Sequence, residues 1–170
     1  MNKLHPLKIN SRKLIWDNNE PRSLDHDDRF FQPNVIDETS EVFIKANNLI
    51  DRWAKNNLNN FKIAELGFGF GLNFLITAKY WYQHNQNNKK WLDYVSIDCF
   101  PLNINDFKKV IANYPELEEF SNVFIEHFPF ECNGFTRIEI PKFKIRLTLI
   151  INDIVCFCLN VLRTESSYEL

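Results

Sequence analysis

The chain has 170 residues, a length that suits one domain with a sizeable core. Hydrophobic residues make up 45% of it and charged residues 25%, both ordinary for a soluble globular protein. The net charge of −2 argues against a surface coated in basic side chains for nucleic acid, but it leaves room for a local basic patch.

The termini and the apolar segments give no sign of a membrane protein. The first twenty residues hold no continuous apolar run, so we expect no signal peptide. No stretch approaches the roughly 18 apolar residues that span a membrane. We therefore expect a cytoplasmic protein without a membrane partner. The four cysteines and four histidines lack metal-ligand spacing, and we expect no metal.

Residues 1–40 are polar and irregular, with proline at positions 21 and 33. Thr39 or Ser40 could cap a helix that runs to about Asn57, because apolar residues recur there at helical spacing. The elements expected after this helix are a strand over 61–66, a helix over 72–82, a strand over 91–97, helices over 104–112 and 115–120, and a strand pair over 135–140 and 145–151. This order predicts an open parallel α/β sheet.

Three alternating glycines, Gly67, Gly69 and Gly71, stand between the first strand of this series and the helix behind it. Glycine adopts positive φ and lets a ligand approach the backbone closely. The following helix offers free N–H groups and the positive end of its dipole. Glu65 precedes the turn, where a carboxylate could meet a cationic group. A glycine turn that serves packing alone is the alternative.

The loop does not fit the dinucleotide fingerprint. That fingerprint requires G-x-G-x-x-G. If it began at Gly67, its last glycine would fall on Leu72, and if it began at Gly69, its last glycine would fall on Phe74. The pattern E-x-G-x-G-x-G is instead typical of class I methyltransferases, whose cofactor carries no pyrophosphate.

Two aspartates follow later strands. Asp98 ends the second strand, where an acid can accept hydrogen bonds from both ribose hydroxyls of a nucleoside. An acid that serves only the N-terminus of the next helix is the alternative. Asp153 follows the strand over 145–151 and could contact an adenine amino group, or it could be a surface acid.

With these residues in view, the chain resembles the methyltransferase half of the bifunctional enzyme that makes 5-methylaminomethyl-2-thiouridine in tRNA. The resemblance runs in order across roughly residues 16–154. The matching stretches are DHDDRFFQ (25–32), DET (37–39), VF (42–43), ELGFGFGLNF (65–74), SIDCFPL (96–102), YPEL (114–117) and NDI (152–154).

The resemblance implies a transferase that uses S-adenosyl-L-methionine to methylate the 5-aminomethyl group of a wobble 2-thiouridine, with tRNA as substrate. It implies cofactor contacts from Glu65, Gly67, Phe68, Gly69, Gly71, Asn73, Asp98 and Asp153. It places Asp28, Phe30 and Phe31 on the substrate side. Asp98 stands where the family usually has glutamate, and Phe30 stands where the family has tyrosine.

The larger departure from the family's sequence pattern lies after Asp153. The family has a further strand there that ends in Asp-Gly-Phe-Ala-Pro, whose aspartate is its expected catalytic carboxylate, and residues 155–170 hold no such motif. The catalytic residue is thus unknown. The expected fold is a class I methyltransferase, or Rossmann-like, fold that is incomplete at the C-terminal side of the sheet. We expect an N-terminal substrate-side segment over 1–60, the first half of the Rossmann-like domain over 61–154, and a divergent tail over 155–170.

In the full fold the strand order is 3-2-1-4-5-7-6, so a sheet that stops after strand 3 leaves strand 1 at its edge. The segment 154–162 could replace the missing neighbour as a strand or lie on the sheet as a terminal helix. We therefore expect a truncated methyltransferase with weak or no activity, or one completed by a separate chain. The alternatives are a non-catalytic half-domain that binds the cofactor or a partner, and a decaying gene fragment.

Overall fold

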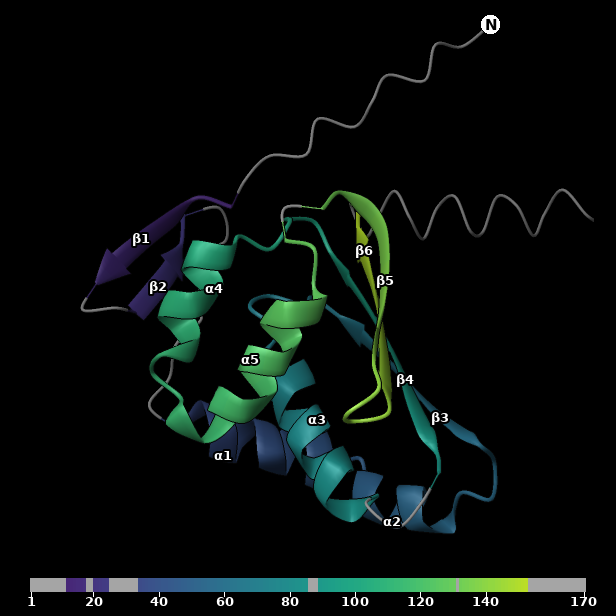
Figure 1. Ribbon diagram of the computed structural model, residues 1–170. Helices are drawn as coiled ribbons and strands as arrows, with labels where there is room; N and C mark the ends of the chain where they lie inside the picture. The colour runs from purple at the N-terminus through teal and green to yellow at the C-terminus, as the bar shows by residue number, and fades with distance from the viewer. Residues whose placement is uncertain (1–11, 18–19, 25–33, 86–88, 131, 153–170) are drawn as a thin grey trace, which may run out of the picture.

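The computed structural model describes residues 12–17, 20–24, 34–85, 89–130 and 132–152. A four-stranded sheet forms the centre, and a separate two-stranded hairpin lies beside helix α4 (Figure 1). The strands are β1 (Leu14–Asp17), β2 (Glu20–Ser23), β3 (Asn60–Leu66), β4 (Trp91–Asp98), β5 (Gly134–Ile140) and β6 (Ile145–Ile151). The helices are α1 (Val35–Thr39), the π-helical η1 (Ser40–Lys45), α2 (Leu49–Lys55), α3 (Leu72–His84), α4 (Ile104–Ile111), the 3₁₀ turn η2 (Pro115–Leu117) and α5 (Glu118–His127).

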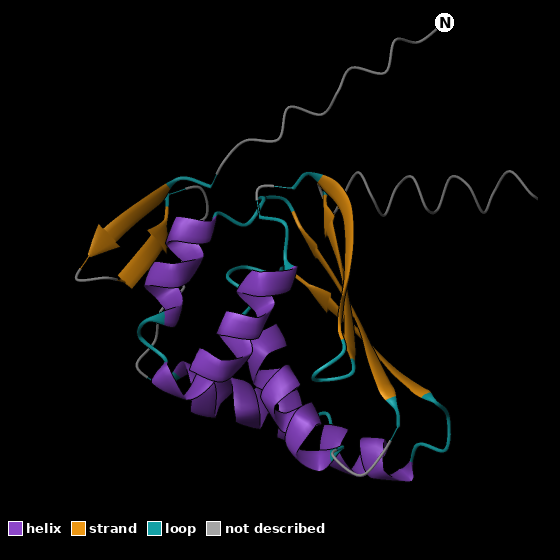
Figure 2. Cartoon of the chain, viewed as in Figure 1, coloured by secondary structure: helices purple, strands orange, loops and turns teal. Residues whose placement is uncertain are grey.

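The central sheet has the order β3-β4-β6-β5. Strands β3, β4 and β6 are parallel, and β5 runs antiparallel to β6. The connections from β3 to β4 and from β4 to β6 step in the same direction across the sheet. Since such crossovers are right-handed, their helices α3, α4 and α5 fall on one side of the sheet, as Figure 2 shows.

Side chains on the helix-covered face form rows across the strands. One row joins Ile63, Tyr94, Leu147 and Ile138, which are all at most 9% exposed. The Phe74 ring of α3 packs edge-on against Tyr94, with ring centroids 5.3 Å apart. Burial of these large apolar groups is the main force that holds the helices to the sheet.

Most of the expected elements are confirmed. The strands over 61–66, 91–97, 135–140 and 145–151 and the helix over 72–82 lie within one or two residues of their predicted bounds. The expected strand pair over 135–140 and 145–151 is an antiparallel hairpin, because the short turn at Pro141–Lys144 can only return the chain antiparallel, so the parallel sheet carries one antiparallel strand, β5. Within the described residues, β3 has no strand partner on its outer side, as the strand order of the full fold predicts.

The N-terminal third differs more from expectation. The helix expected over 39–57 begins earlier, at Val35, and is divided where Asn48 adopts a left-handed φ of 49°. The hairpin β1–β2 falls in a part of the chain that we expected to be irregular. No helix within the described ranges is both long and apolar enough to cross a membrane.

Candidate functional site

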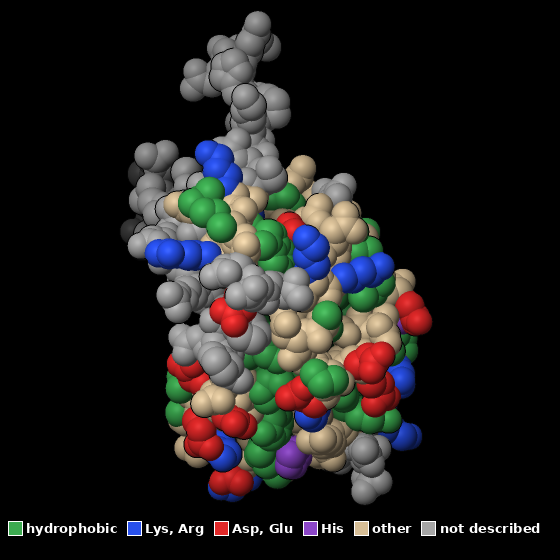
Figure 3. All heavy atoms as spheres, turned by 90° about the vertical axis from the view of Figure 1, so that its left-hand side faces the viewer, with side chains coloured by type: hydrophobic (Ala, Val, Ile, Leu, Met, Phe, Trp, Pro, Cys, Tyr) green, Lys and Arg blue, Asp and Glu red, His purple; other side chains and the backbone are tan. Residues whose placement is uncertain are grey.

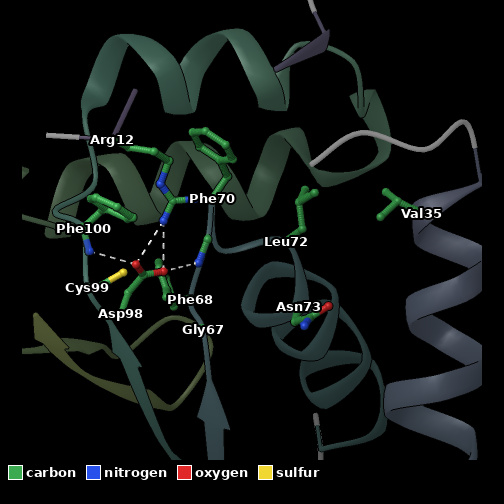
Figure 4. A pocket seen from close by; sticks show the side chains of 11 residues that line it. Arg12, Val35, Gly67, Phe68, Phe70, Leu72, Asn73, Asp98, Cys99 and Phe100 are labelled. Carbon is green, nitrogen blue, oxygen red and sulfur yellow. Dashed lines mark hydrogen bonds and ion pairs between the residues drawn. The ribbon is translucent and has the colours of Figure 1, made fainter. Parts of the chain in front are cut away.

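A cavity of about 390 Å³ opens at the carboxyl ends of β3 and β4 (Figure 4). Ligands of open α/β sheets bind at this edge, and small-molecule sites commonly measure about 300–1,000 Å³. The lining residues come from the N-terminal segment, α1, the glycine loop, the start of α3 and the loop after β4. They are Arg12, Val35, Gly67, Phe68, Gly69, Phe70, Leu72, Asn73, Asp98, Cys99 and Phe100.

The glycine loop is left-handed at all three glycines, with φ of 86° at Gly67, 59° at Gly69 and 72° at Gly71. A Cβ atom added at Gly67 or Gly69 would meet nothing within 4 Å, so both positions border open space. A Cβ atom at Gly71 would lie 2.9 Å from Cζ of Phe68. The first two glycines therefore leave room for a ligand beside the backbone, and the third lets the Phe68 ring pack beneath the loop.

Asp98 is the acid of this cavity and is 5% exposed. Its Oδ2 accepts a hydrogen bond from the Gly69 amide at 2.7 Å, and its Oδ1 accepts one from the Phe100 amide at 2.9 Å. One nitrogen of Arg12, Nη2, lies 3.0 Å from each carboxylate oxygen. The last residue of β4 is thus bonded to the glycine loop and to the N-terminal segment at the same time.

Arg12 was not among the predicted site residues. Its guanidinium lies 5.3 Å from the ring centroid of Phe70 and 5.2 Å from that of Phe100, within the range of cation–π attraction. Figure 4 shows the side chain between these two rings, directed at Asp98. No local motif marks Arg12, because Phe70, Phe100 and Asp98, which it contacts here, lie at least 58 positions away in sequence.

Behind the cavity, a chain of hydrogen bonds joins motif residues that are distant in sequence. Glu65 is 7% exposed and accepts hydrogen bonds from Asn73 Nδ2 at 2.9 Å and from Ser96 Oγ at 2.8 Å. Thr39 Oγ1 donates in turn to Asn73 Oδ1 at 3.2 Å. Glu65 therefore fixes the side chain of Asn73, whose residue lines the cavity.

Burial sets the acid–base properties of this buried cluster. Desolvation raises the pKa of Glu65, and the hydrogen bonds from Asn73 and Ser96 oppose that rise. Burial also raises the pKa of Tyr94 well above its usual value, and the negative charge of Glu65 adds to the effect. Tyr94 therefore remains a neutral phenol, and Glu65 takes up a proton more readily than a carboxylate in water.

The structure brings most of the predicted cofactor residues together. Five of them line the cavity, namely Gly67, Phe68, Gly69, Asn73 and Asp98. Gly71 precedes α3, and Glu65 lies behind Asn73. The predicted residues Asp28, Phe30, Phe31 and Asp153 lie outside the described residues. Within the described ranges, no three His, Cys, Asp or Glu side chains come together as a metal site.

Sequence comparison finds relatives that are 32–39% identical to this chain. A protein named tRNA 5-methylaminomethyl-2-thiouridine biosynthesis bifunctional protein MnmC, from Legionella pneumophila strain Corby, is 38% identical over 146 residues. Its namesakes from Leptospira borgpetersenii and Methylobacillus flagellatus are 39% and 32% identical over 144 and 143 residues. This chain is homologous to part of MnmC. The matches cover 83–84% of the chain but only 22% of each relative.

Structural comparison agrees with this assignment. The crystal structure of MNMC2 from Aquifex aeolicus superposes with a TM-score of 0.55 at 14% identity, over 86% of this chain and 44% of that one. The fold is the methyltransferase-like α/β fold, of which the described sheet forms one part. No protein-family model matches the chain. The resemblance to MnmC seen in the sequence motifs is confirmed.

Proposed function

We propose that this chain binds S-adenosyl-L-methionine and provides the cofactor half of a methyltransferase that acts on the 5-aminomethyl group of 2-thiouridine in tRNA. The observation that carries the proposal is the open glycine loop beside a buried aspartate at the carboxyl ends of two parallel strands. The name of the MnmC relatives supports the substrate, because 5-methylaminomethyl-2-thiouridine carries a methyl group on the amine.

The described residues fit such a cofactor. Gly67 and Gly69 leave open space beside the backbone for it. Asp98 stands at the end of β4, where a carboxylate can accept hydrogen bonds from two ribose hydroxyls once the Arg12 guanidinium is displaced from it. Phe70 and Phe100 offer two apolar rings at the same end of the cavity, where a base can pack. Glu65 holds Asn73 toward the loop. When bound, S-adenosyl-L-methionine supplies an electrophilic methyl group.

The substrate side rests on residues outside the described ranges. We propose Asp28, Phe30 and Phe31 for contacts to the modified uridine and Asp153 for the adenine amino group. Most of the rate of such a transfer comes from holding a neutral amine in line with the methyl group. Figure 3 shows the side of the molecule that carries the hairpin and α4: Lys and Arg side chains lie on both its upper and lower parts, whereas Asp and Glu side chains gather mostly on its lower part. Exposed Arg22, Lys108 and Lys109 belong to these elements, and they favour approach of a tRNA backbone from this side.

The test is calorimetric titration with S-adenosylhomocysteine, the demethylated cofactor, followed by a methyl-transfer assay. Gly69→Asn should abolish binding, because asparagine tolerates the left-handed φ but fills the open space beside the loop. Gly134→Asn is the matched control, since Gly134 has a φ of 79° and equally open surroundings but does not line the cavity. Binding that survives Gly69→Asn would refute the assignment of the loop.

A second candidate is a half-domain that binds the cofactor without turnover. It requires only the described cavity, because Gly67, Gly69 and Asp98 can hold a cofactor without the substrate-side residues. The two candidates separate in one assay with tRNA that carries 5-aminomethyl-2-thiouridine and with radiolabelled S-adenosyl-L-methionine. Incorporation of label supports the enzyme, and binding without incorporation supports the half-domain.

A further inference from the structure

The Asp98 carboxylate has no free acceptor position. A carboxylate offers about four lone-pair sites. Oδ1 accepts from Arg12 and from the Phe100 amide, and Oδ2 accepts from Arg12 and from the Gly69 amide. The two amide bonds belong to the loops that build the cavity. Only Arg12 can leave without dismantling the site.

Arg12 also occupies the apolar part of the same subsite. Its guanidinium lies near both the Phe70 and the Phe100 ring, and the side chains of Arg12 and Asp98 are only 10% and 7% exposed. A nucleoside whose ribose reached Asp98 would need the space that this side chain fills. Arg12 and a nucleoside therefore compete for one carboxylate and one pair of rings.

We propose that Arg12 is a latch that closes the nucleoside subsite in the absence of cofactor and must release Asp98 before the cofactor binds. This inference rests on the proposed function, because it assigns the regulation of that same site. Arg12 lies two residues before β1, and the Leu24 amide after β2 donates to the Lys13 carbonyl at 3.0 Å. Release of Arg12 therefore loosens the anchor of the β1–β2 hairpin.

The hairpin has a second, weaker attachment. The Lys109 ammonium of α4 lies 4.8 Å from the ring centroid of Trp16 on β1. An exposed cation–π contact is weaker than a buried ion pair, so Arg12 is the stronger of these two anchors. Cofactor binding and hairpin mobility should change together.

Affinity tests the latch directly. When only a fraction of the molecules is open, the apparent Kd equals the intrinsic Kd divided by that fraction. Arg12→Ala should thus bind S-adenosylhomocysteine about tenfold or more tightly than the unaltered chain in calorimetric titration. Lys13→Ala, which removes the neighbouring cation, should leave the affinity unchanged. Equal or weaker binding by Arg12→Ala overturns the latch.

Hydrogen exchange tests it without relying on affinity. Arg12→Ala should speed amide exchange in β1 and β2, and saturating S-adenosylhomocysteine should speed it in the unaltered chain while slowing exchange in the glycine loop. Lys13→Ala should leave amide exchange in β1 and β2 unchanged. Hairpin exchange that is unchanged by Arg12→Ala, or slowed by the ligand, overturns the proposal.

The two experiments keep the latch and the proposed function apart. If Arg12→Ala, Lys13→Ala and the unaltered chain bind S-adenosylhomocysteine with the same affinity and Gly69→Asn does not bind it, the cofactor site stands and the latch is overturned. If none binds it, the proposed function fails. The exchange rates of Arg12→Ala then still decide whether Arg12 holds the hairpin against the cavity.

Discussion

At the scale of single residues, Gly71 meets two constraints at once. Its φ is 72°, and a Cβ atom there would lie 2.9 Å from the Phe68 ring. Gly71→Ala should lower the free energy of unfolding by roughly 2–4 kcal/mol, from the left-handed backbone and from the overpacked ring together. Urea denaturation followed by circular dichroism measures the change.

A substitution at Gly134 separates the cost of the left-handed backbone from the cost of the overpacked ring. Gly134 has a φ of 79°, but a Cβ atom there would have nothing within 4 Å. Gly134→Ala should therefore cost only the backbone part, about 1–2 kcal/mol. Equal losses in the two variants would show that the contact with Phe68 relaxes without cost.

The raised pKa of Glu65 predicts how the stability of the folded chain changes with pH. Burial raises the pKa of Glu65 in the folded chain above the usual 4.5, so the folded state holds this proton to higher pH than the unfolded state does. The contribution of Glu65 to the free energy of unfolding is fully present below about pH 4.5 and declines as the pH rises through the pKa of Glu65 in the folded chain. Glu65→Gln, which has similar shape and stays neutral, removes this decline.

The measurement is urea denaturation of both chains at a series of pH values from 4 upward. The stability of Glu65→Gln relative to the unaltered chain should rise with pH over the window that begins near pH 4.5. Ser96→Ala is an informative control, because it removes one hydrogen bond to the carboxylate and should steepen the decline. A stability difference that is constant with pH would contradict the raised pKa.

The site residues that could be predicted from the sequence share one property, which is that their signal is local. Gly67, Gly69 and Asp98 stand at the ends of two apolar strands, and short-range pattern alone identifies such positions. Arg12 could not be predicted, because its role comes from a contact with a residue 86 positions away. Glu65 was expected to meet the cofactor; the hydrogen bonds to Asn73 and Ser96 favour an indirect role, and its contact with the cofactor stays a prediction.

At the scale of elements, the central strands were predictable because each is a short segment rich in apolar residues, with polar residues interspersed, that is bounded by turns or loops. Strands β4 and β6 lie between neighbouring strands and are mostly apolar, although β4 contains Asp93, Ser96 and Asp98 and β6 contains Arg146 and Thr148. The hairpin β1–β2 has strands of only four residues with Pro21 inside, so neither alternation nor length marked it. The helix expected from 39 to 57 is broken because the backbone turns left-handed at Asn48. A single asparagine in the sequence is not enough to predict such a turn.

At the scale of the whole molecule, the direction of the crossovers leaves one face of the sheet without helices from the described residues (Figure 1). The strand register aligns Leu66, Ile97, Ile150 and Phe135 in an apolar row that crosses this face at the carboxyl ends of the parallel strands. A row of charged residues, Lys62, Asp93, Arg146 and Glu139, crosses it nearer the other end. Parallel sheets are normally covered on both faces, but here the two ends of the apolar row are exposed, whereas Ile97 within it is 8% exposed.

The ends of the apolar row are the most exposed large hydrophobic side chains on this face, with Leu66 at 72% and Phe135 at 67%. Exposed apolar side chains and an edge strand such as β3, which has no outer partner within the described residues, both promote association. The chain at high concentration should therefore associate in sedimentation velocity, and Leu66→Lys and Phe135→Lys should each shift it toward the monomer. Leu58→Lys is the matched control, because Leu58 is also 72% exposed but lies in the loop before β3. If Leu58→Lys reduces association as strongly as Leu66→Lys, general charge repulsion is the cause and the apolar row is not the contact surface.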